Sequence, residues 1–375
     1  MTTVHEISYS YAVLEGTSYE IGKAQGEQFL ANAPDYVDFM TSKGPLKTNL
    51  TQVKRAIAFF ERYTPGVNEE IHGFADAVGV HPERIVYYAV SHSERGHCSH
   101  FAALPALTAD RHLYVGRSYE WGLKDDFRLC TTRVSGKAAH SGFSVYLFGR
   151  LDGLNEYGLT VTMSAAIPKS KPQEDGCLFW AVIRTVLERC QTVPEAIDLI
   201  QAIPIAFNFN LIVADRSGAA ALMEIVCAQR SVKQIGPQTP EQLLCSTNHL
   251  TLPGTAELTS DRHWHSLVRH QTLESRLRAA APHIDPAAIR AILSDHLPDG
   301  VCCHYYSEGL GTLWSILYDL TAGTMEVCFG SPQLNPWQTI RLTDPVGVHP
   351  VTAKLPDESS HGDIWRKITA LGRKS

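Results

Sequence analysis

Apolar residues in the first ninety positions recur with a helical period. Between residues 50 and 63, for example, Val53, Ile57 and Phe60 fall on one face of a helix. Pro65 then ends that helix, because proline cannot continue the hydrogen-bond ladder. The same pattern predicts helices from Thr17, over 50–63, over 67–78 and after Pro82. Residues 1–10 are predicted to form a short strand or arm, so this part of the chain is mostly helical.

The pattern changes after residue 98 to short β-prone runs separated by turn residues. The predicted strands are 99–104, 112–118, 127–134, 143–149, 159–165, 209–214, 219–226, 230–235, 243–247, 312–318 and 324–330. The predicted helices are 178–189, one opening at Val193, 260–280 and 286–294. This order of strands and helix pairs is typical of an α+β layered sandwich. Residues 331–375 contain several prolines and are expected to be irregular.

Composition narrows the class of protein. The 375 residues carry a net charge of −6 without a block of basic residues, which argues against nucleic acid and anionic membranes as partners. The start of the chain lacks a basic region followed by an apolar core, and no apolar run reaches membrane-spanning length. Nine scattered cysteines without a CxxC pair indicate reduced thiols. We therefore expect a cytoplasmic protein.

Cys98 stands where the helical pattern gives way to strands. A thiol is a weak nucleophile at neutral pH unless a base or a lowered pKa assists it. A cysteine that begins a chain carries its own base, because an α-amine titrates near ~8. Here this would require removal of the preceding peptide by attack of the thiol on the carbonyl of residue 97. Taken alone, Cys98 is also compatible with a buried structural cysteine.

Several sequence motifs around and beyond Cys98 occur together in one known group. The run 96–121 resembles the start of the catalytic chain in the penicillin acyltransferase / choloylglycine hydrolase group of N-terminal nucleophile hydrolases. Further segments match the group's motifs in order: 14–22, 71–80, 153–159, 209–215, 246–249, 260–262, 294–296, 302–304, 312–315 and 330–332. No single segment is decisive, but the collinear set is specific and covers roughly residues 14–332.

The resemblance implies a fold and an activity. The fold is the four-layer αββα sandwich of the N-terminal nucleophile hydrolases, preceded by a helical pro-segment. Residues 1–97 would form that pro-segment and remain bound as a small chain after self-cleavage, while residues 98–375 would form the catalytic chain. The activity is cleavage of a linear amide bond in a small N-acylated molecule through a thioester on Cys98.

The resemblance also assigns roles to individual residues. Cys98 would supply the thiolate and the α-amine, and Arg117 would favour the thiolate. Glu120 stands where the group usually has Asp, which orients the new α-amine. Asn248 matches the residue that contacts the scissile amide or its oxyanion. Arg262 matches an arginine that closes the site behind Asn248.

Two departures from the group concern the cleavage site and the oxyanion. His97 precedes the nucleophile where close relatives have Gly, which more readily adopts the strained backbone that cleavage needs. We expect slower cleavage, or assistance by the His97 imidazole as an acid. The group's second oxyanion donor, an Asn, is replaced by Ser164 or Ala165. The Ser164 hydroxyl or the backbone N–H of Ser99 is expected to substitute.

Other kinds of site are also considered. The runs 97–100 and 302–304 contain metal-ligand residue types, but adjacent residues of an extended chain point to opposite faces, so we expect no metal and no cofactor. A cysteine enzyme without processing would use His249 or His304 as base. An uncleaved binding scaffold is a further alternative.

The expected partners are a small-molecule amide substrate and the chain's own pro-segment. The sequence leaves open the acyl and amine halves of the substrate and the formation of homo-oligomers. It also leaves open whether water or an amine resolves the thioester. Hydrolysis is preferred because water is always present.

Overall fold

The computed structural model describes residues 3–32, 34–42, 50–91, 97–123, 127–145, 147–166, 176–259 and 262–368. The helices are α1 (Ser18–Asn32), α2 (Pro34–Ser42), α3 (Leu50–Tyr63), α4 (Val67–Val78), α5 (Pro82–Ser91), α6 (Phe179–Arg189), α7 (Val193–Ala202), α8 (Trp264–Ala280) and α9 (Pro286–Ser294). Most of the predicted elements are confirmed, and α3, α4 and α9 have the predicted bounds. Helix α2 was not predicted.

The strands form two large sheets. The larger, sheet A, has the order β11-β10-β9-β8-β7-β5-β4-β1-β18, with β6 beside β5. The smaller, sheet B, has the order β12-β2-β3-β15-β16-β17, with β14 beside β15. Strands of sheet A are β1 (Thr3–Gly16), β4 (Arg128–Val134), β5 (His140–Val145), β6 (Gly149–Arg150), β7 (Asp152–Asn155), β8 (Leu159–Ala165), β9 (Asn208–Asp215), β10 (Ala220–Val226), β11 (Gln229–Ile235) and β18 (Gly347–Asp357). Strands of sheet B are β2 (His97–Ala103), β3 (Tyr114–Trp121), β12 (Leu243–Ser246), β14 (His304–Tyr305), β15 (Leu310–Asp319), β16 (Thr324–Phe329) and β17 (Trp337–Ile340), and β13 (Arg262–His263) pairs separately with β19 (Lys367–Ile368).

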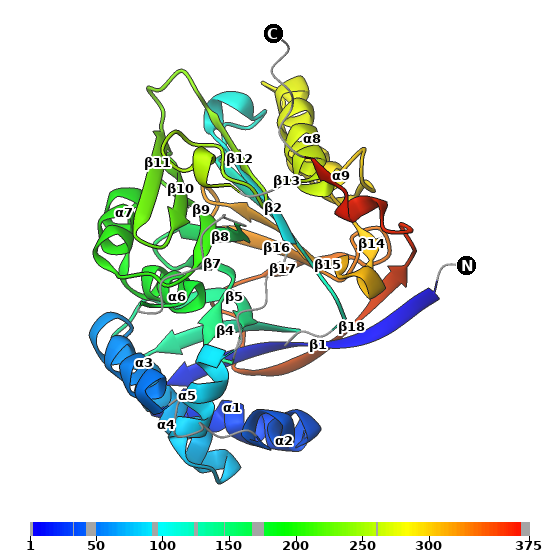
Figure 1. The fold of residues 1–375 in the computed structure, drawn as a ribbon. Helices are drawn as coiled ribbons and strands as arrows, with labels where there is room; N and C mark the ends of the chain where they lie inside the picture. Colours follow the sequence, from blue (N-terminus) through cyan, green and yellow to red (C-terminus); the bar gives the residue numbers. More distant parts are fainter. Residues whose placement is uncertain are drawn as a thin grey trace.

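The two sheets pack face to face between two pairs of helices. Strand β2 packs against β8 and β9, α6 and α7 cover sheet A, and α8 and α9 cover sheet B. Figure 1 shows α8 and α9 on the side of the molecule opposite the N-terminal helices. Between the sheets, the indole of Trp314 stacks on Tyr119 of its own sheet B at 4.1 Å and on Phe143 of sheet A at 3.9 Å between ring centroids. The predicted four-layer αββα sandwich is confirmed.

Capping residues set the starts of two of these covering helices. The Thr192 side chain accepts a hydrogen bond from the backbone N–H of Glu195 at the start of α7. Asp285 does the same for the N–H of Ala288 at the start of α9. Both helices have proline in their first turn, where its missing N–H has no intrahelical partner to lose. Local sequence therefore fixes where these helices begin.

Helices α1 and α4 pack with their backbones in close contact. A Cβ atom on Gly22 would lie 1.9 Å from the carbonyl oxygen of Glu70, and one on Gly73 would lie 2.0 Å from that of Tyr19. Any larger residue at either position would force the helices apart. The two glycines of the matched segments 14–22 and 71–80 thus have a packing role.

The first 97 residues are joined to the rest of the chain by a strand and by a buried ion pair. Strand β1 is longer than predicted and lies inside sheet A, parallel to β4 and antiparallel to β18. Glu70 of α4 lies 2.5 Å from the Arg184 guanidinium of α6, and both side chains are buried. Phe60 and Phe74 pack on Trp180 and Phe148, with ring centroids 5.3 and 5.6 Å apart. These contacts would persist after a cut at residue 97.

The expectation that residues 331–375 are irregular is wrong for β17 and β18. Strand β18 pairs with β1 over its whole length at the edge of sheet A. Its Pro350 and Pro356 lie opposite Ser10 and Val4. Proline is tolerated in an edge strand, because one side of the strand needs no ladder hydrogen bond.

All nine cysteines are unpaired. Among the described helices, none is long and apolar enough to cross a membrane.

Candidate active site

The strand pair β2–β3 presents two chemically different faces. Cys98 lies opposite Tyr119 and His100 lies opposite Arg117 in the pairing register. Because side chains alternate across a strand, Cys98, His100 and Arg117 share one face. His100 contacts Thr162 and Arg117 contacts Asp152, and both partners belong to sheet A. This face therefore points toward sheet A.

The face toward sheet A holds the thiol beside a guanidinium. Cys98 is fully buried, and Arg117 Nη2 lies 3.7 Å from its Sγ. Arg117 Nε lies 2.5 Å from Asp152 Oδ2, and its Nη1 donates to the carbonyl of Met163. Burial raises the pKa of the Cys98 thiol to about 11, and Arg117 lowers it only in part. In the intact chain the thiol is therefore protonated.

Asp152 is a site residue that the sequence interpretation missed. Its carboxylate is buried, accepts a hydrogen bond from the backbone N–H of Phe143, and lies 3.3 Å from the indole Nε1 of Trp314. The signal was one acidic residue directly before the matched segment 153–159. Asp152 holds the Arg117 side chain in place, so the arginine reaches Cys98 from a fixed position.

The opposite face of β2–β3 lies against α8 and holds the carboxylate. His97 is paired with Glu120 and Ser99 with Ser118 in the register. Ser118 Oγ donates to Glu120 Oε1, and Arg269 Nη1 lies 3.3 Å from Glu120 Oε2. Burial raises the pKa of Glu120 to about 7, although Arg269 and the Ser118 hydrogen bond lower it. This carboxyl group titrates near neutral pH.

Among the described hydrogen bonds, the arginine that contacts Asn248 is Arg269. Arg269 Nη2 donates to Asn248 Oδ1 at 2.7 Å, and its Nη1 donates to Ser99 Oγ at 2.6 Å. Arg262 lies on the short strand β13, where its backbone pairs with Ile368. The role expected of Arg262 stays a prediction. Arg269 is buried on one face of α8, which begins at Trp264, and this face brings it to the site. Residues 260 and 261 of the matched segment lie outside the described residues.

Asn248 connects the two faces. Its Oδ1 accepts from the backbone N–H of Cys98 at 3.2 Å and from Arg269. Its Nδ2 donates to the carbonyl of Ala165 at 2.9 Å, and its backbone N–H donates to Ser266 Oγ. Asn248 thus presents its oxygen to Cys98 in the intact chain. The predicted role of Asn248 toward the scissile amide or its oxyanion stays a prediction.

Ser164 belongs to a buried polar cluster beneath Cys98. Its hydroxyl donates to the carbonyl of Thr247, and the side chains of Asn210 and His100 each lie 3.2 Å from its Oγ. Asn210 stands directly opposite Ser164 in the β8–β9 pairing. The Ser164 hydroxyl proton is therefore engaged by Thr247 and does not point to an oxyanion in this geometry. Asn210 is a further buried amide near the site that the sequence interpretation did not single out.

His97 sits in an aromatic enclosure next to the predicted cleavage point. Its ring centroid lies 4.9 Å from both His265 and Trp365 and 6.0 Å from Trp121. Burial, with the charge of Arg269, lowers the pKa of His97 to about 3. The imidazole is therefore neutral at pH 7, which disfavours the expected role of His97 as an acid.

The histidine bases of an unprocessed cysteine enzyme have other partners. His249 Nδ1 lies 2.9 Å from Ser266 Oγ, and His304 Nε2 lies 2.8 Å from Ser331 Oγ. Among the described contacts of Cys98, the side-chain partners are Arg117 and Asn248. The geometry therefore favours the α-amine of Cys98 as the base over a papain-like cysteine–histidine pair.

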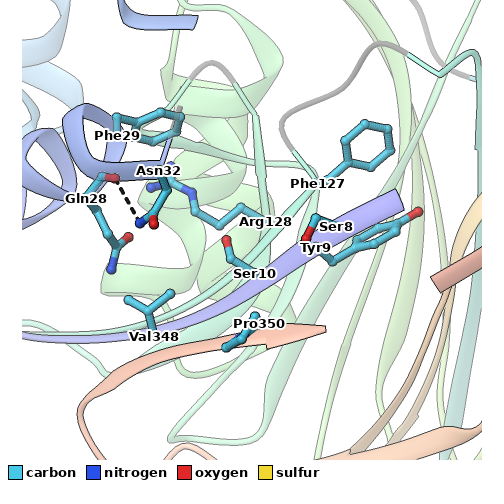
Figure 2. A pocket seen from close by; sticks show the side chains of 10 residues that line it. All are labelled: Ser8, Tyr9, Ser10, Gln28, Phe29, Asn32, Phe127, Arg128, Val348 and Pro350. Carbon is cyan, nitrogen blue, oxygen red and sulfur yellow. Dashed lines mark hydrogen bonds between the residues drawn. The ribbon is translucent and has the colours of Figure 1, made fainter. Parts of the chain in front are cut away.

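Two cavities lie where the first 97 residues meet the rest of the chain. One, of about 480 Å³, opens between α1, β1 and β18. Figure 2 shows the Arg128 side chain starting beside Ser10 and extending toward Phe29 and Asn32 of α1. A second, of about 420 Å³, lies between α3 and the segment before α6. None of their lining residues is among those described around Cys98.

Comparison with known proteins places the chain in a family. Residues 108–334 match the family described as acyl-coenzyme A:6-aminopenicillanic acid acyl-transferase. This range includes Arg117, Glu120, Asn248 and Arg269 and begins after Cys98. No curated protein matches the sequence.

Three solved structures that are similar to this chain come from different organisms. Penicillin V acylase of Agrobacterium tumefaciens is 18% identical, covers 68% of this chain and 90% of its own, and has a TM-score of 0.47. The N-acylethanolamine-hydrolyzing acid amidase orthologue of Caenorhabditis elegans has 14% identity, 60% and 93% coverage and a TM-score of 0.41. A mutant of conjugated bile acid hydrolase from Clostridium perfringens has 15% identity, 68% and 96% coverage and a TM-score of 0.39.

The family match extends over more than half of the chain and confirms the resemblance that the ordered motifs indicated. The chain belongs to the acyl-coenzyme A:6-aminopenicillanic acid acyl-transferase family.

Proposed function

We propose that the chain cleaves itself between His97 and Cys98 and then acts on a linear amide of a small N-acylated molecule. One observation carries this proposal. The backbone nitrogen of Cys98, which cleavage would turn into the α-amine, is already held by Asn248 Oδ1 at 3.2 Å, and the thiol of the same residue lies beside Arg117. Nucleophile and future base are therefore positioned before the cut.

Self-cleavage would proceed through an N→S acyl shift. The Cys98 thiol adds to the carbonyl carbon of residue 97, the C–N bond breaks, and the nitrogen takes up the thiol proton. The product is a thioester on Sγ with a free α-amine. Water then hydrolyses the thioester, leaving a carboxylate on His97 and a thiol on Cys98.

Glu120 would act on the new α-amine through two intermediaries. Its carboxylate contacts Arg269, Arg269 donates to Asn248 Oδ1, and that oxygen accepts from the Cys98 nitrogen. Glu120 and Arg269 are therefore positioning residues, because neither touches the reacting atoms. The additional methylene of Glu, compared with the Asp of the group, is accommodated by this relay.

Turnover would use the same atoms. The α-amine takes the thiol proton, Sγ attacks the amide carbonyl of the substrate, and the amine half leaves with a proton. Water resolves the thioester to a free acid, which makes the enzyme an amidohydrolase. The family description favours a second candidate, in which an amine takes the place of water and the enzyme is an acyltransferase. The acyl group then moves to that amine.

The pro-segment would stay bound as a small subunit. Strand β1 keeps its pairing with β4 and β18, and Glu70 keeps its contact with Arg184. A buried ion pair is costly to break from one side, since the remaining charge loses its partner. The mature protein would therefore be a tightly associated pair of chains.

A denaturing gel with intact-mass analysis tests the proposal. We expect a fragment ending at His97 and one beginning at Cys98 that together account for the 41.4 kDa chain. The purified protein should also release an amine from a panel of N-acyl amines, and added amine acceptors should distinguish transfer from hydrolysis. A full-length band in which Cys98 resists alkylation, without turnover, would establish the uncleaved scaffold instead.

A further inference from the structure

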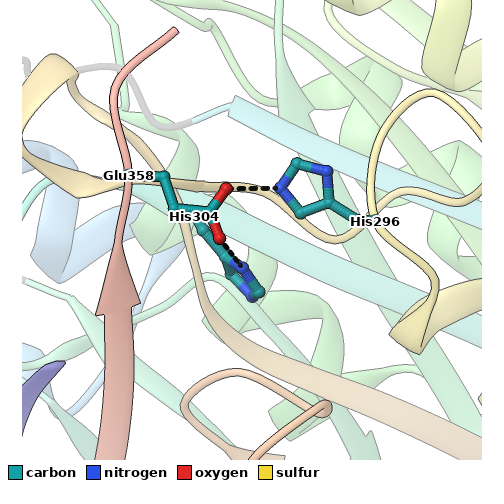
Figure 3. Close-up of side chains that lie close together, drawn as sticks. All are labelled: His296, His304 and Glu358. Atoms are coloured by element: carbon teal, nitrogen blue, oxygen red, sulfur yellow. Dashed lines mark ion pairs between the residues drawn. The ribbon is translucent and has the colours of Figure 1, made fainter. Parts of the chain in front are cut away.

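Three side chains from separate parts of the chain meet at one edge of sheet B. His296 follows α9, His304 lies on β14, and Glu358 follows β18. Their ligand atoms all lie within 4.8 Å of one another. Figure 3 shows the Glu358 carboxylate between the two rings, with one oxygen toward each.

The separations suit ligands of one cation better than hydrogen bonds. Glu358 Oε2 lies 3.6 Å from His296 Nε2, and Oε1 lies 3.5 Å from His304 Nδ1. A hydrogen bond of this type spans about 2.7–3.2 Å. Ligands about 2.0–2.1 Å from a tetrahedral zinc ion lie about 3.3–3.4 Å from each other. For comparison, His112 Nδ1 and Asp319 Oδ2 lie 2.8 Å apart, at hydrogen-bond distance.

The other nitrogen of each ring has a hydrogen-bond partner, and the partner of His296 also sets its tautomer. His296 Nδ1 lies 2.8 Å from the carbonyl of Leu297, which can only accept, so this nitrogen carries the proton. His296 Nε2 is then a lone pair aimed at a carboxylate, and this buried atom has no hydrogen-bond partner among the described residues. His304 Nε2 lies 2.8 Å from Ser331 Oγ, which leaves Nδ1 for a metal. Outer partners of this kind are usual for metal-bound histidines.

We propose that His296 Nε2, His304 Nδ1 and the Glu358 carboxylate bind a divalent transition metal of the zinc class. Two imidazoles and one carboxylate form a donor set that suits Zn²⁺, with a fourth position left for water. The side chains of His296 and Glu358 are 29% and 39% exposed, so an ion can enter from solvent. The His304 side chain is buried and forms the base of the site.

The metal would anchor the segment that covers His97. Glu358 N–H donates to the carbonyl of His304 at 2.7 Å, and the chain then continues to Trp365. Trp365 packs edge-on against His97, at 4.9 Å between ring centroids. Fixing Glu358 would therefore restrain residues 358–368 near the His97–Cys98 peptide bond.

Zinc titration of the full chain in chelator-free buffer tests the site. All three ligands lie beyond residue 98, so the outcome does not depend on self-cleavage. The wild type is expected to bind one Zn²⁺ saturably. His296→Gln and Glu358→Gln should each weaken binding at least about 100-fold. His81→Gln is the matched control, because His81 lies 3.7 Å from Glu83 in a pair that has no third ligand among the described residues. It should bind like the wild type.

Several results would overturn the proposal. These are a wild type that takes up no Zn²⁺ saturably, variants that bind as tightly as the wild type, and loss of binding in Cys302→Ser with retention in Glu358→Gln. Cys302 is included because its Sγ lies 3.3 Å from His304 Nε2. If the variants do not fold, Co²⁺ loaded into the wild type decides. A four-coordinate spectrum without a thiolate charge-transfer band supports the ligand set, and a thiolate band contradicts it.

Discussion

Two buried glutamates beside arginines show opposite behaviour in this molecule. Glu188 of α6 lies 2.7 Å from Arg184 and 2.8 Å from Lys137. Burial raises its pKa, but these two cations outweigh burial and lower it to about 2. Glu120 of β3 lies 3.3 Å from Arg269, and burial outweighs that cation and raises the pKa to about 7.

The difference lies in how each cation is shared. The three guanidinium nitrogens of Arg184 contact Glu70, Glu188 and the carbonyl of Phe148, and Lys137 is the second cation, so two cations match two carboxylates. Arg269 divides its donors among Glu120, Ser99, Asn248 and His265, so its carboxylate is only partly neutralised. The first network joins the N-terminal segment to the core. The second leaves the Glu120 carboxyl with a raised pKa, and perturbed pKa values of this kind cluster at functional sites.

The largest expected effect comes from removing the nucleophile. In Cys98→Ala we expect no fragment and a fall in turnover of at least about 10³-fold, because the attacking atom is lost. Denaturing gels and amide-cleavage assays measure both. Cys328→Ala, which removes another buried thiol of sheet B, should cleave and turn over normally. Turnover by the Cys98 variant would refute the proposed mechanism.

The ion pair between segments should be needed for stability and not for chemistry. Replacing Arg184 by Met leaves Glu70 and Glu188 buried without their shared cation, and we expect a loss of about 3–5 kcal/mol in the free energy of unfolding. Urea denaturation measures this. The processed variant should also release its small chain on gel filtration. Retention of full stability would show that the Arg184 network does not join the two segments.

The two candidate arginines behind Asn248 should separate clearly. Arg269→Lys loses the fork that reaches Asn248 and Ser99 together, and we expect self-cleavage and kcat to fall about 10–100-fold with little change in KM. Arg262→Lys should change either rate less than about threefold. The opposite ranking would return the role to Arg262.

The smallest effect concerns the pH dependence of stability, measured in a Cys98→Ala background that keeps the chain intact. Folding raises the pKa of Glu120 from 4.5 to about 7. Its contribution to the free energy of unfolding is therefore full below pH 4.5 and is lost as the pH rises through 7. Between pH 5 and 8, Glu120→Gln should therefore become more stable relative to its Cys98→Ala parent, by at most about 3 kcal/mol in the free energy of unfolding.

Glu188→Gln should behave in the opposite way. Folding lowers the pKa of Glu188 to about 2. Its contribution to the free energy of unfolding is therefore present above pH 4.5 and is lost as the pH falls through 2. The variant should be less stable than its parent at neutral pH, by about 1–3 kcal/mol, and approach it in acid. Melting curves from pH 3 to 8 provide both comparisons. Parallel curves for the two variants would contradict the contrast between the networks.

Local patterns predicted most of the fold. Helical periodicity gave α3 and α4, and the capping residues Asp285 and Thr192 account for the starts of α9 and α7. Strand β18 was missed because its prolines argue against a strand, and edge placement, which permits them, depends on pairing with distant β1.

The candidate site was predictable where motifs were continuous. Cys98, Arg117, Glu120 and Asn248 lie together as the ordered motifs indicated. Asp152 and Arg269 were missed because their roles arise from packing between elements: Asp152 from sheet A and Arg269 from α8. The cluster of His296, His304 and Glu358 was missed for the same reason, since its three members come from three segments.

The central claim is that Cys98 becomes an N-terminal nucleophile, and the most direct measurement is a time course of intact mass on freshly purified chain, with identification of the first residue of the larger product. We predict disappearance of the 41.4 kDa species and appearance of a chain beginning with Cys98, with amide cleavage rising in step. Amide cleavage by a chain that stays whole, with His97 still attached to Cys98, would contradict the claim.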